Sequence, residues 1–400
     1  MKGGNCIVGP ETVRMLELGH PWVIADRYTR KWPKGRSGDL VELTDERGRV
    51  LATALLDPED RVVARVLGHG KMSLDRPWVQ ERVERAAALR RDHADLTETT
   101  AYRLVNGEGD GLPGLTVDRY GEHLMVQLYS AAWKPHLPLV TSALQQVFTP
   151  SGIYEKFRPQ KTRELAGESR GKKFSRLLAG TAAPGRVAVR ENGLDLLVTL
   201  EEELNTGLFL DQRANRRDLM GRCRGKRILN LFSYTGAFSV AAAAAGAERV
   251  TSVDASAHYL DWAKENFSVN RLNPKRHEFI EGDCLAVLKE LQRQGRLFDL
   301  VLMDPPSFST TRQSRFTTRG GTSDLVEASL PLLVAGGLLI TSSNHQKVDL
   351  ADYLKELRRA ALQAGSELRV IRVAAQPEDF PYPVTFPEGR YLKYIISVKD

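Results

Sequence analysis

A turn and two aspartates, each following an apolar run, are the residues whose types and spacing could do chemistry. The run 228–232 ends in a turn that contains Thr235 and Gly236, and Asp254 follows the next apolar run, 249–253, at 18 residues beyond Gly236. A strand, a glycine-containing turn, a helix and a second strand that ends in a carboxylate suit a nucleoside cofactor. The turn lets the cofactor lie against backbone, and the acid accepts the two ribose hydroxyls.

The single glycine of this turn narrows the choice of cofactor. The pyrophosphate fingerprint Gly-x-Gly-x-x-Gly is absent, which favours a nucleoside without a diphosphate, such as S-adenosylmethionine. That molecule also needs a polar contact for its adenine amine, and Asp283, which ends the predicted strand 278–282, could supply it. Asp304-Pro305-Pro306 lies at the end of a later apolar run and strengthens the prediction. The alternative is that these aspartates merely sit at strand ends in solvent.

Alternating strands and helices are expected to position these residues. From residue 211 onward the pattern predicts helices at 211–222, 237–245, 257–269, 285–294 and 323–335, and strands at 227–232, 249–253, 277–281, 298–303 and 337–343. Such alternation predicts a parallel sheet covered by helices on both faces, as in α/β proteins. The carboxyl ends of its strands would meet at one edge, where the turn and the aspartates lie.

The first half of the chain has a different pattern. Residues 1 to about 72 contain few helix signals, and the runs 38–43, 49–56 and 62–66 predict a small β-barrel. A helix is expected at 77–94, then further strands and a helix at 137–147, so the middle of the chain is predicted to be α+β.

Composition limits the class of protein. Charged residues make up 27% and apolar residues 42% of the chain, which is typical of a soluble globular protein. No apolar run approaches the length of a membrane span, and the N-terminus lacks the apolar core of a secretory signal. The three cysteines are few and widely spaced, so neither a disulfide framework nor a metal site is expected and a cytoplasmic location is favoured.

Positive charge suggests a polyanionic partner. The net charge is +7, and the segment 156–176 holds eight Lys or Arg and two Glu, with Phe157 and Phe174 among them. Such a run can also be just a solvated face, but interleaved aromatic residues favour nucleic acid. The candidate RNA-binding residues are Lys156, Arg158, Lys161, Arg163, Lys172, Lys173, Arg312 and Arg315.

The motifs together resemble the bacterial three-domain 23S rRNA methyltransferases of class I type. His20-Pro21-Trp22 with the Gly38-Asp39 strand is similar to their PUA-like RNA-binding module, and the stretch 102–119 is similar to their central domain. Thr206-Gly-Leu-Phe-Leu-Asp-Gln-Arg213 and the C-terminal strand region 386–393 match the methyltransferase part. The resemblance implies a PUA-like domain at 1–72, a central α+β domain at 73–190 and a Rossmann-like class I methyltransferase domain at 191–400.

The resemblance also implies an S-adenosylmethionine site and an RNA substrate. Asp211 and Arg213 would contact the cofactor, the turn 232–236 would line its methionine part, and the partner would be 23S rRNA or a large-subunit assembly intermediate. The expected cofactor-binding residues are Phe209, Asp211, Arg213, Asn230, Phe232, Ser233, Tyr234, Gly236, Asp254, Ser256, Asp283, Cys284 and Asp304.

The choice of target atom rests on one position, Asn344, where this chain departs from the pattern of the family. Methylation of cytosine C5 needs a cysteine thiolate that adds to C6, and the C5-specific members carry that cysteine where this chain has Asn344. Guanine N7 has a free lone pair and needs chiefly alignment, so N7 is favoured and C5 remains the alternative. The expected catalytic residues are Asp304, Pro305, Pro306, Phe308 and Asn344.

Other classes stay open. Methylation of an exocyclic amine is possible, although the motif for that reaction usually opens with Asn where this chain has Asp304. A small-molecule or protein methyltransferase would need neither the β-barrel nor the basic segment. An RNA assembly factor with a vestigial site is disfavoured by intact Asp254, Asp283 and Asp304.

Overall fold

A computed structural model describes residues 5–158, 174–306, 308–310, 315–317 and 321–400. The chain divides into two compact units. The first comprises Met1–Val189, Val198–Thr206 and Glu378–Gly389, and the second comprises Arg190–Leu197, Gly207–Pro377 and Arg390–Asp400. Among the described residues, no helix is both long enough and apolar enough to cross a membrane.

The first unit begins with a five-stranded sheet in the order β1-β3-β4-β5-β2. Its strands are β1 (Asn5–Ile7), β2 (Trp22–Ile24), β3 (Leu40–Thr44), β4 (Val50–Leu56) and β5 (Val62–His69). Helix α1 (Pro10–Glu17) was not anticipated from the sequence, because it is only eight residues long with one buried side chain, Leu16. A helix this short makes a weak periodic pattern and depends on tertiary packing.

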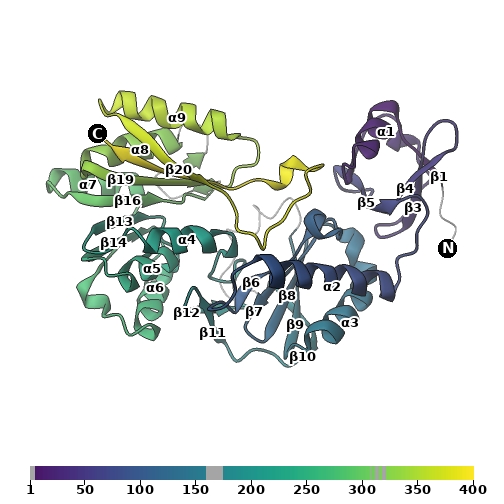
Figure 1. Cartoon of the computed structure of the whole chain (residues 1–400), viewed down its shortest axis with the longest axis horizontal. Coiled ribbons are helices and arrows are strands. Elements are labelled where there is room, and N and C mark those ends of the chain that lie inside the picture. The colour runs from purple at the N-terminus through teal and green to yellow at the C-terminus, as the bar shows by residue number, and fades with distance from the viewer. Residues whose placement is uncertain (1–4, 159–173, 307, 311–314, 318–320) are drawn as a thin grey trace. The chain divides into compact units, whose positions relative to one another are not determined.

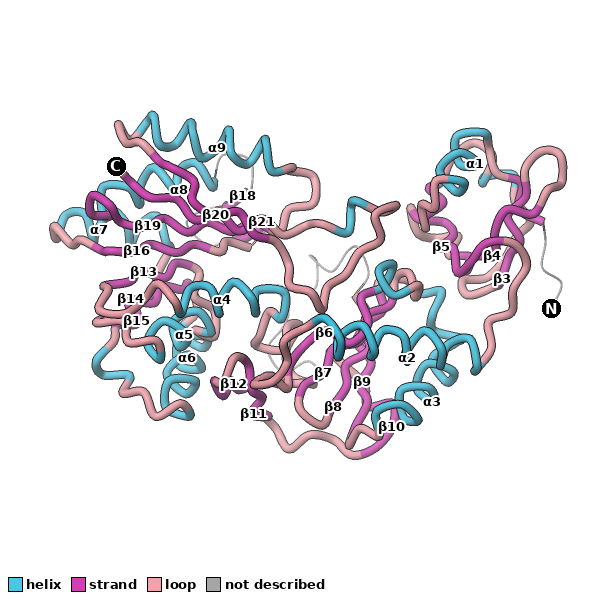
Figure 2. The backbone as a smooth tube through the Cα atoms, viewed as in Figure 1, coloured by secondary structure: helices cyan, strands magenta, loops and turns pink. Residues whose placement is uncertain are grey.

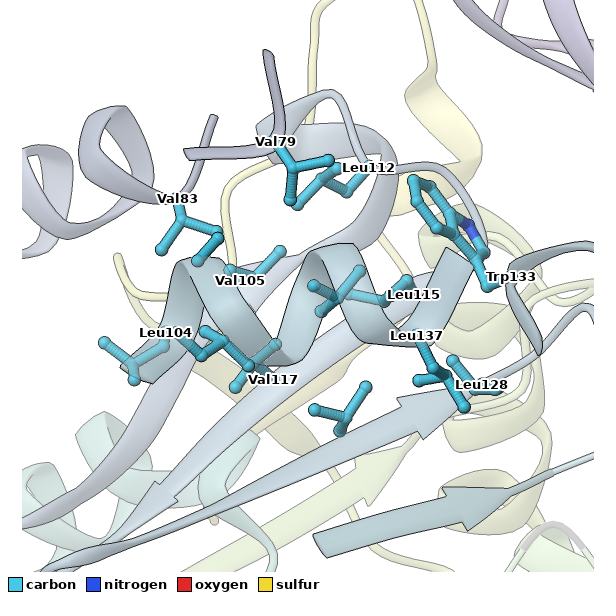
Figure 3. Packing of buried hydrophobic residues seen from close by; sticks show 14 of the residues in the cluster. Val79, Val83, Leu104, Val105, Leu112, Leu115, Val117, Leu128, Trp133 and Leu137 are labelled. Atoms are coloured by element: carbon cyan, nitrogen blue, oxygen red, sulfur yellow. The ribbon is translucent and has the colours of Figure 1, made fainter. Parts of the chain in front are cut away.

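A second five-stranded sheet follows, in the order β10-β9-β8-β7-β6. Its strands are β6 (Ala101–Asn106), β7 (Leu115–Tyr120), β8 (His123–Leu128), β9 (Gly152–Phe157) and β10 (Arg176–Gly180). Helices α2 (Arg76–His93) and α3 (Leu137–Phe148) pack on each other. Figure 3 shows their apolar side chains meeting those of the sheet in a core that contains Val79, Leu104 and the fully buried Trp133. Strands β11 (Arg186–Glu191) and β12 (Leu194–Thr199) then form a separate two-stranded sheet.

The second unit is built on a seven-stranded sheet in the order β15-β14-β13-β16-β19-β21-β20 (Figure 2). Its strands are β13 (Arg227–Leu231), β14 (Arg249–Asp254), β15 (Glu278–Glu281), β16 (Phe298–Met303), β19 (Leu333–Ser343), β20 (Leu368–Ala374) and β21 (Lys393–Lys399). The first five in this order are parallel, and β21 pairs antiparallel with both β19 and β20. The expected parallel sheet is therefore present, and β21 and β20 extend it at one side through antiparallel pairing.

Helices cover both faces of this sheet (Figure 1). Helices α4 (Arg213–Met220), α5 (Ala237–Ala244) and α6 (Ala257–Val269) contact one another in one group. Helices α7 (Cys284–Arg293), α8 (Gly321–Ser329) and α9 (Leu350–Gln363) form the other group. The predicted arrangement of an α/β sheet between two helical layers is confirmed.

One expected helix boundary in this unit was wrong. The helix expected at 323–335 ends at Ser329, and β19 already begins at Leu333. Pro331 explains the early end, because proline has no N–H to donate and its ring disfavours the helical conformation of the preceding residue. The stretch 386–393, which resembles the C-terminal strand region of the family, contains a short 3₁₀ helix at Pro387–Gly389 and leads into β21 at Lys393.

Strand register brings the candidate residues together. Leu231 at the end of β13 lies beside Val253 of β14 and beside Met303 of β16. The turn that follows β13 is therefore flanked by Asp254 on one side and by Asp304 on the other. The turn and both aspartates thus lie at the carboxyl ends of β13, β14 and β16. Open α/β sheets bind ligands at the carboxyl ends of their strands.

Candidate functional site

The turn between β13 and α5 has an unusual backbone that Asp254 holds in place. Phe232, Tyr234 and Gly236 have φ angles of 57°, 51° and 78°, and positive φ is uncommon for residues with a side chain. The carboxylate of Asp254 accepts hydrogen bonds from the backbone N–H groups of Tyr234, at 2.8 Å, and Ser256, at 3.0 Å. These bonds offset the cost of the strained turn and fix its shape.

Burial and hydrogen bonding act in opposite directions on the charge of Asp254. Burial raises the pKa of this carboxyl, while the N–H groups of Tyr234, Ser256 and Ala255 lower it and leave a net increase. A carboxylate has about four acceptor positions, so bonds to the backbone leave capacity for further hydroxyl donors. Asp254 can therefore both shape the turn and accept hydrogen bonds from a ligand.

Gly236 is required by packing as well as by its φ angle. A Cβ atom at this position would lie 2.7 Å from the Cβ of Ala263 in α6, closer than two carbon atoms can approach. The glycine thus lets α6 pack against the turn. The glycine was expected to let a cofactor approach the backbone, and in the structure the close neighbour of Gly236 is a helix of the protein.

Other groups at the turn fit an organic ligand with polar parts. The buried Oγ of Ser233 has no hydrogen-bond partner in the part of the chain that the structure describes. The ring of Tyr234 lies 5.4 Å from that of Phe209 and 4.5 Å from that of Tyr259, and Phe209 is 45% exposed. A partly open aromatic surface beside an unused hydroxyl and a carboxylate suits a nucleoside, whose ring is apolar and whose sugar is polar.

The segment before α4 is tied to this turn. The carbonyl oxygen of Gly207 accepts a hydrogen bond from Thr235 Oγ1 at 2.6 Å. Arg216 of α4 donates to the carbonyl oxygen of Phe209 at 2.6 Å and forms a buried ion pair with Glu191. The segment 207–213 is therefore held beside the turn, as a cap over a ligand there would have to be.

Asp304, directly after β16, is partly buried and contacts two buried polar side chains. Its Oδ2 accepts a hydrogen bond from Gln212 Nε2 at 2.9 Å, and the same nitrogen lies 2.8 Å from Ser342 Oγ. Burial raises the pKa of Asp304 to about 6, helped by the nearby charge of Asp211, while bonds from Ser342 and Gln212 lower it. Gln212 was not singled out from the sequence, although it lies in the matched segment 206–213.

The remaining predicted cofactor residues lie in varied settings. Asn230 is buried and donates to Ser239 of α5 at 2.9 Å. Asp283 does not simply end a strand: it caps the N-terminus of α7 by accepting from the N–H of Ala286 at 3.1 Å. Asp283 lies just after β15, as expected, and also has this capping role, because an Asp before a helix satisfies one of its free N–H groups. Cys284, beside it, is buried.

The predicted target-side residues are only partly described. Pro305 is buried and Pro306 exposed after Asp304, and Asn344 is exposed after β19. Phe308 lies in strand β17 (Phe308–Thr310), which pairs with β18 (Arg315–Thr317), but its side chain is outside the described part.

One predicted RNA-binding residue must be corrected. Lys156 is 1% exposed, and its Nζ donates to the carbonyl oxygens of Glu203 and Leu204 at 2.8 and 3.1 Å. Burial lowers the pKa of Lys156 to about 7, and Arg158 adds to this effect. Its ammonium therefore faces backbone carbonyls inside the first unit and is not available to a phosphate.

The other predicted RNA contacts are less fully described. Arg158 donates to Leu204 O at 2.7 Å and is partly exposed. Lys161, Arg163, Lys172, Lys173 and Arg312 lie outside the described residues, and only the backbone of Arg315 is described.

The three cysteines lie in the interior of the protein. The thiols of Cys6, Cys223 and Cys284 are all buried, and none of these three is in a disulfide. Burial raises the pKa of Cys6 to about 11 and that of Cys223 to about 12, and raises that of Cys284 still further. A protonated thiol is a poor nucleophile. Within the described residues, no group of three His, Cys, Asp or Glu is placed to hold a metal ion.

The family to which this chain belongs is shown by a match over most of its length. A family model described as S-adenosylmethionine-dependent methyltransferase matches residues 102–388. The chain belongs to this methyltransferase family. A second model, described as a PUA-like domain, matches residues 7–69, which are the residues of the first sheet and its surroundings.

Two named relatives match nearly the whole length of this methyltransferase. A protein of Klebsiella pneumoniae subsp. pneumoniae named ribosomal RNA large subunit methyltransferase I is 34% identical over 379 residues, which are 94% of this chain and 93% of that protein. A protein of the same name from Yersinia pseudotuberculosis is 34% identical over 376 residues, 94% of each chain.

Solved structures agree with the fold and the cofactor. A putative SAM-dependent methyltransferase from Streptococcus mutans is 28% identical, covers 98% of this chain and 99% of its own, and superposes with a TM-score of 0.86. A putative methyltransferase complexed with SAH has the same identity and coverage and a TM-score of 0.88. The methyltransferase described here therefore uses S-adenosylmethionine, and its PUA-like and Rossmann-like domains are those that the sequence predicted.

Proposed function

We propose that this methyltransferase modifies a base of 23S rRNA, and that the atom it methylates is N7 of guanine. The RNA substrate is supported by likeness along nearly the whole chain to relatives named for ribosomal RNA of the large subunit. The PUA-like match and the net charge of +7 agree with it. The proposal of N7 as the target atom is supported by the surroundings of Asp304 and of the three cysteines.

The observation that carries the choice of N7 is the burial of all three thiols. Methylation at cytosine C5 requires a thiolate that adds to the base, and thiols with raised pKa inside the protein do not supply one. Asn344 stands where the C5-specific members have their cysteine, and its amide is not a nucleophile. A route without covalent help to the base fits these residues.

Methylation of N7 needs no proton transfer from the base. The N7 lone pair forms a bond to the methyl carbon while the carbon–sulfur bond breaks, and its electron pair stays on sulfur, so the sulfonium becomes a neutral thioether. What the protein must supply is alignment of nitrogen, carbon and sulfur. In this proposal Asp304 accepts hydrogen bonds from the N–H groups of guanine, Pro305 and Pro306 shape the backbone there, and Phe308 and Asn344 contact the base.

The cofactor would be held by the residues around the turn. Asp254 would accept the ribose hydroxyls, Asp283 would contact the adenine amine, and the turn 232–236 would line the methionine part with the Ser233 hydroxyl among its polar groups. Asp211 and Arg213 would contact it from the segment 207–213. This assignment uses polar groups that lie at one edge of one sheet.

RNA binding would be shared by the N-terminal parts. We propose the division into a PUA-like domain at 1–72, a central domain at 73–190 and the methyltransferase domain at 191–400, with Arg158 and the basic residues of 159–173 contacting phosphates. Extruding a base from a duplex costs a few kcal/mol, so exposed rRNA or a large-subunit assembly intermediate is the favoured substrate.

The proposal is tested on rRNA and on the thiols. Mass spectrometry of 23S rRNA from a deletion strain should show one 7-methylguanosine lost, and the purified enzyme should restore it. A variant with Cys6, Cys223 and Cys284 all changed to Ala should stay active, whereas Asp304→Ala should lose roughly 10²-fold in rate. Loss of a 5-methylcytidine, with an inactive but folded triple variant, would establish the C5 reaction instead. Unchanged rRNA with a missing mark on a protein or metabolite would refute the RNA substrate.

A further inference from the structure

Gln212 and Asp304 make a contact that joins the cofactor-side segment to the target-side motif. Gln212 lies between Asp211 and Arg213 in the segment beside the turn, and Asp304 follows β16. The side-chain amide of Gln212 has two N–H groups, and its nitrogen lies 2.9 Å from Asp304 Oδ2 and 2.8 Å from Ser342 Oγ. Both N–H groups of this amide are therefore used, one on Asp304 after β16 and one on Ser342 near the end of β19.

A third residue determines which way the amide points. Asn215, one turn further along α4, donates from Nδ2 to Gln212 Oε1 at 2.7 Å. If the amide of Gln212 were reversed, its oxygen would face the carboxylate of Asp304 and its NH₂ would face the NH₂ of Asn215. Because both of those contacts are repulsive, the network allows Gln212 only to donate to Asp304.

Burial makes this arrangement costly to disturb. Gln212 and Asn215 are each 2% exposed and Ser342 is 1% exposed, so water does not replace a bond lost by any of these three, although Asp304 itself is partly exposed. A carboxylate that accepts from Gln212 keeps other acceptor positions, which can receive N–H groups from a base.

From this geometry we infer that Gln212 is a positioning residue: it keeps the carboxylate of Asp304 ionised and turned so that it accepts hydrogen bonds from the target base. The inference rests on the proposed function for the identity of that base. The contact between Gln212 and Asp304 is present in the protein alone, so this part of the inference does not depend on the identity of the base.

The charges around Asp304 show why such support is needed. Burial and the negative charge of Asp211 raise the pKa of Asp304 to about 6, while Gln212, Ser342 and Arg216 lower it. Tyr353 and Tyr394 also lie close enough for Asp304 to raise their pKa values, and both are neutral phenols at physiological pH. A carboxyl poised about one unit below neutral becomes substantially protonated if a stabilising donor is removed.

The test uses two variants and a matched control. Gln212→Met keeps the length of the side chain but removes the amide, and Gln212→Glu places a second carboxyl beside Asp304, so that the two share a proton. Gln292→Met is the control, because Gln292 of α7 also donates an amide hydrogen bond, to the carbonyl oxygen of Ala328 at 2.7 Å. The S-adenosylmethionine affinity of each variant is measured first, so that all rates are compared at saturating cofactor.

The decisive measurement is the pH dependence of kcat/KM for methyl transfer to an rRNA transcript. The wild type should lose activity as the pH falls through the pKa of Asp304, at about 6. In both Gln212 variants this acidic limb should move upward, by about one pH unit for Gln212→Glu. The rate loss should then be about twofold at pH 7 and about fivefold at pH 6, and should disappear at higher pH. Gln292→Met should keep the wild-type limb.

A second measurement separates this inference from the proposed function. Carbon-13 NMR of the Asp304 carboxyl, assigned by Asp304→Asn, follows the same titration in the enzyme without RNA. Gln212→Met should raise its midpoint whatever the substrate proves to be. An unmoved midpoint, or a rate loss that is equal at every pH, would overturn the inference, since a merely structural role predicts both. If Gln212→Met does not fold, Gln212→Glu, which is isosteric with the native side chain, provides the same test.

Discussion

The hydroxyl of Tyr391 lies 2.7 Å from Oδ2 of Asp211, although 180 residues separate the two in the chain. Tyr391 precedes β21, which pairs antiparallel with β19 in the second unit. This bond therefore ties Asp211, in the segment 207–213 beside the turn, to the residue that leads into the antiparallel strand β21. Asp211 is also the charged group that helps to raise the pKa of Asp304.

Tyr391→Phe should weaken cofactor binding modestly. The change removes one hydrogen bond to a carboxylate, so the affinity for S-adenosylmethionine should fall by about 1 kcal/mol, or roughly fivefold, through loss of order in Asp211. Isothermal titration calorimetry measures it directly. Tyr129→Phe is the control, because Tyr129 is 41% exposed in the first unit. Equal affinity in wild type and Tyr391→Phe would mean that Asp211 does not contact the cofactor.

Asp254→Ala should weaken S-adenosylmethionine binding by about 1–3 kcal/mol, because it removes the proposed ribose acceptor and leaves N–H groups of the turn without a partner. Asp349→Ala is a matched control: Asp349 also accepts a backbone N–H, from Asp352 at 2.7 Å, but at the start of α9. Calorimetry should show a loss only for Asp254→Ala. A folded Asp254→Ala enzyme with full affinity would exclude this placement of the cofactor.

RNA affinity should fall steeply with salt, because contacts to phosphates release bound counterions. Charge reversal at Lys172 and Lys173 should flatten a plot of log affinity against log salt and leave cofactor affinity intact. Lys156→Met should keep the wild-type slope, since Lys156 is buried against Glu203 and Leu204. Filter binding of an rRNA fragment at several salt concentrations measures these slopes. A salt-independent affinity would point to a small, uncharged substrate.

The buried Lys156 should also make stability depend on pH. Its pKa is lowered to about 7 in the folded protein, below the value of 10.5 for a free lysine. Between these values the unfolded chain binds more protons, so the free energy of unfolding rises with pH across this window. The gain in melting temperature from about pH 7 to about pH 9 should be smaller in Lys156→Met than in the wild type. Lys71→Met, at a lysine whose side chain is 69% exposed, should retain the full gain. An identical gain in all three proteins would contradict the lowered pKa.

Local patterns in the sequence were enough to predict the α/β architecture and the edge of the sheet that carries the site. The alternation of apolar runs reflects which side chains face the core, and that is decided within a few residues. Asp254 and Asp304 follow β14 and β16, so the parallel register brings them to the two sides of the turn. Where a local rule competed with the pattern, as at Pro331, the expected boundary was wrong.

Only the tertiary structure decided how the polar groups of the site are used. The sequence marks Gln212 and Asp304 in separate motifs 92 residues apart, and no local pattern indicates that one donates to the other. It also presents Lys156 as one more cation in a basic run, whereas the fold buries it against backbone carbonyls. A buried polar group must find a partner, and the chain that supplies that partner is chosen by packing over long sequence distances rather than by neighbours in the sequence.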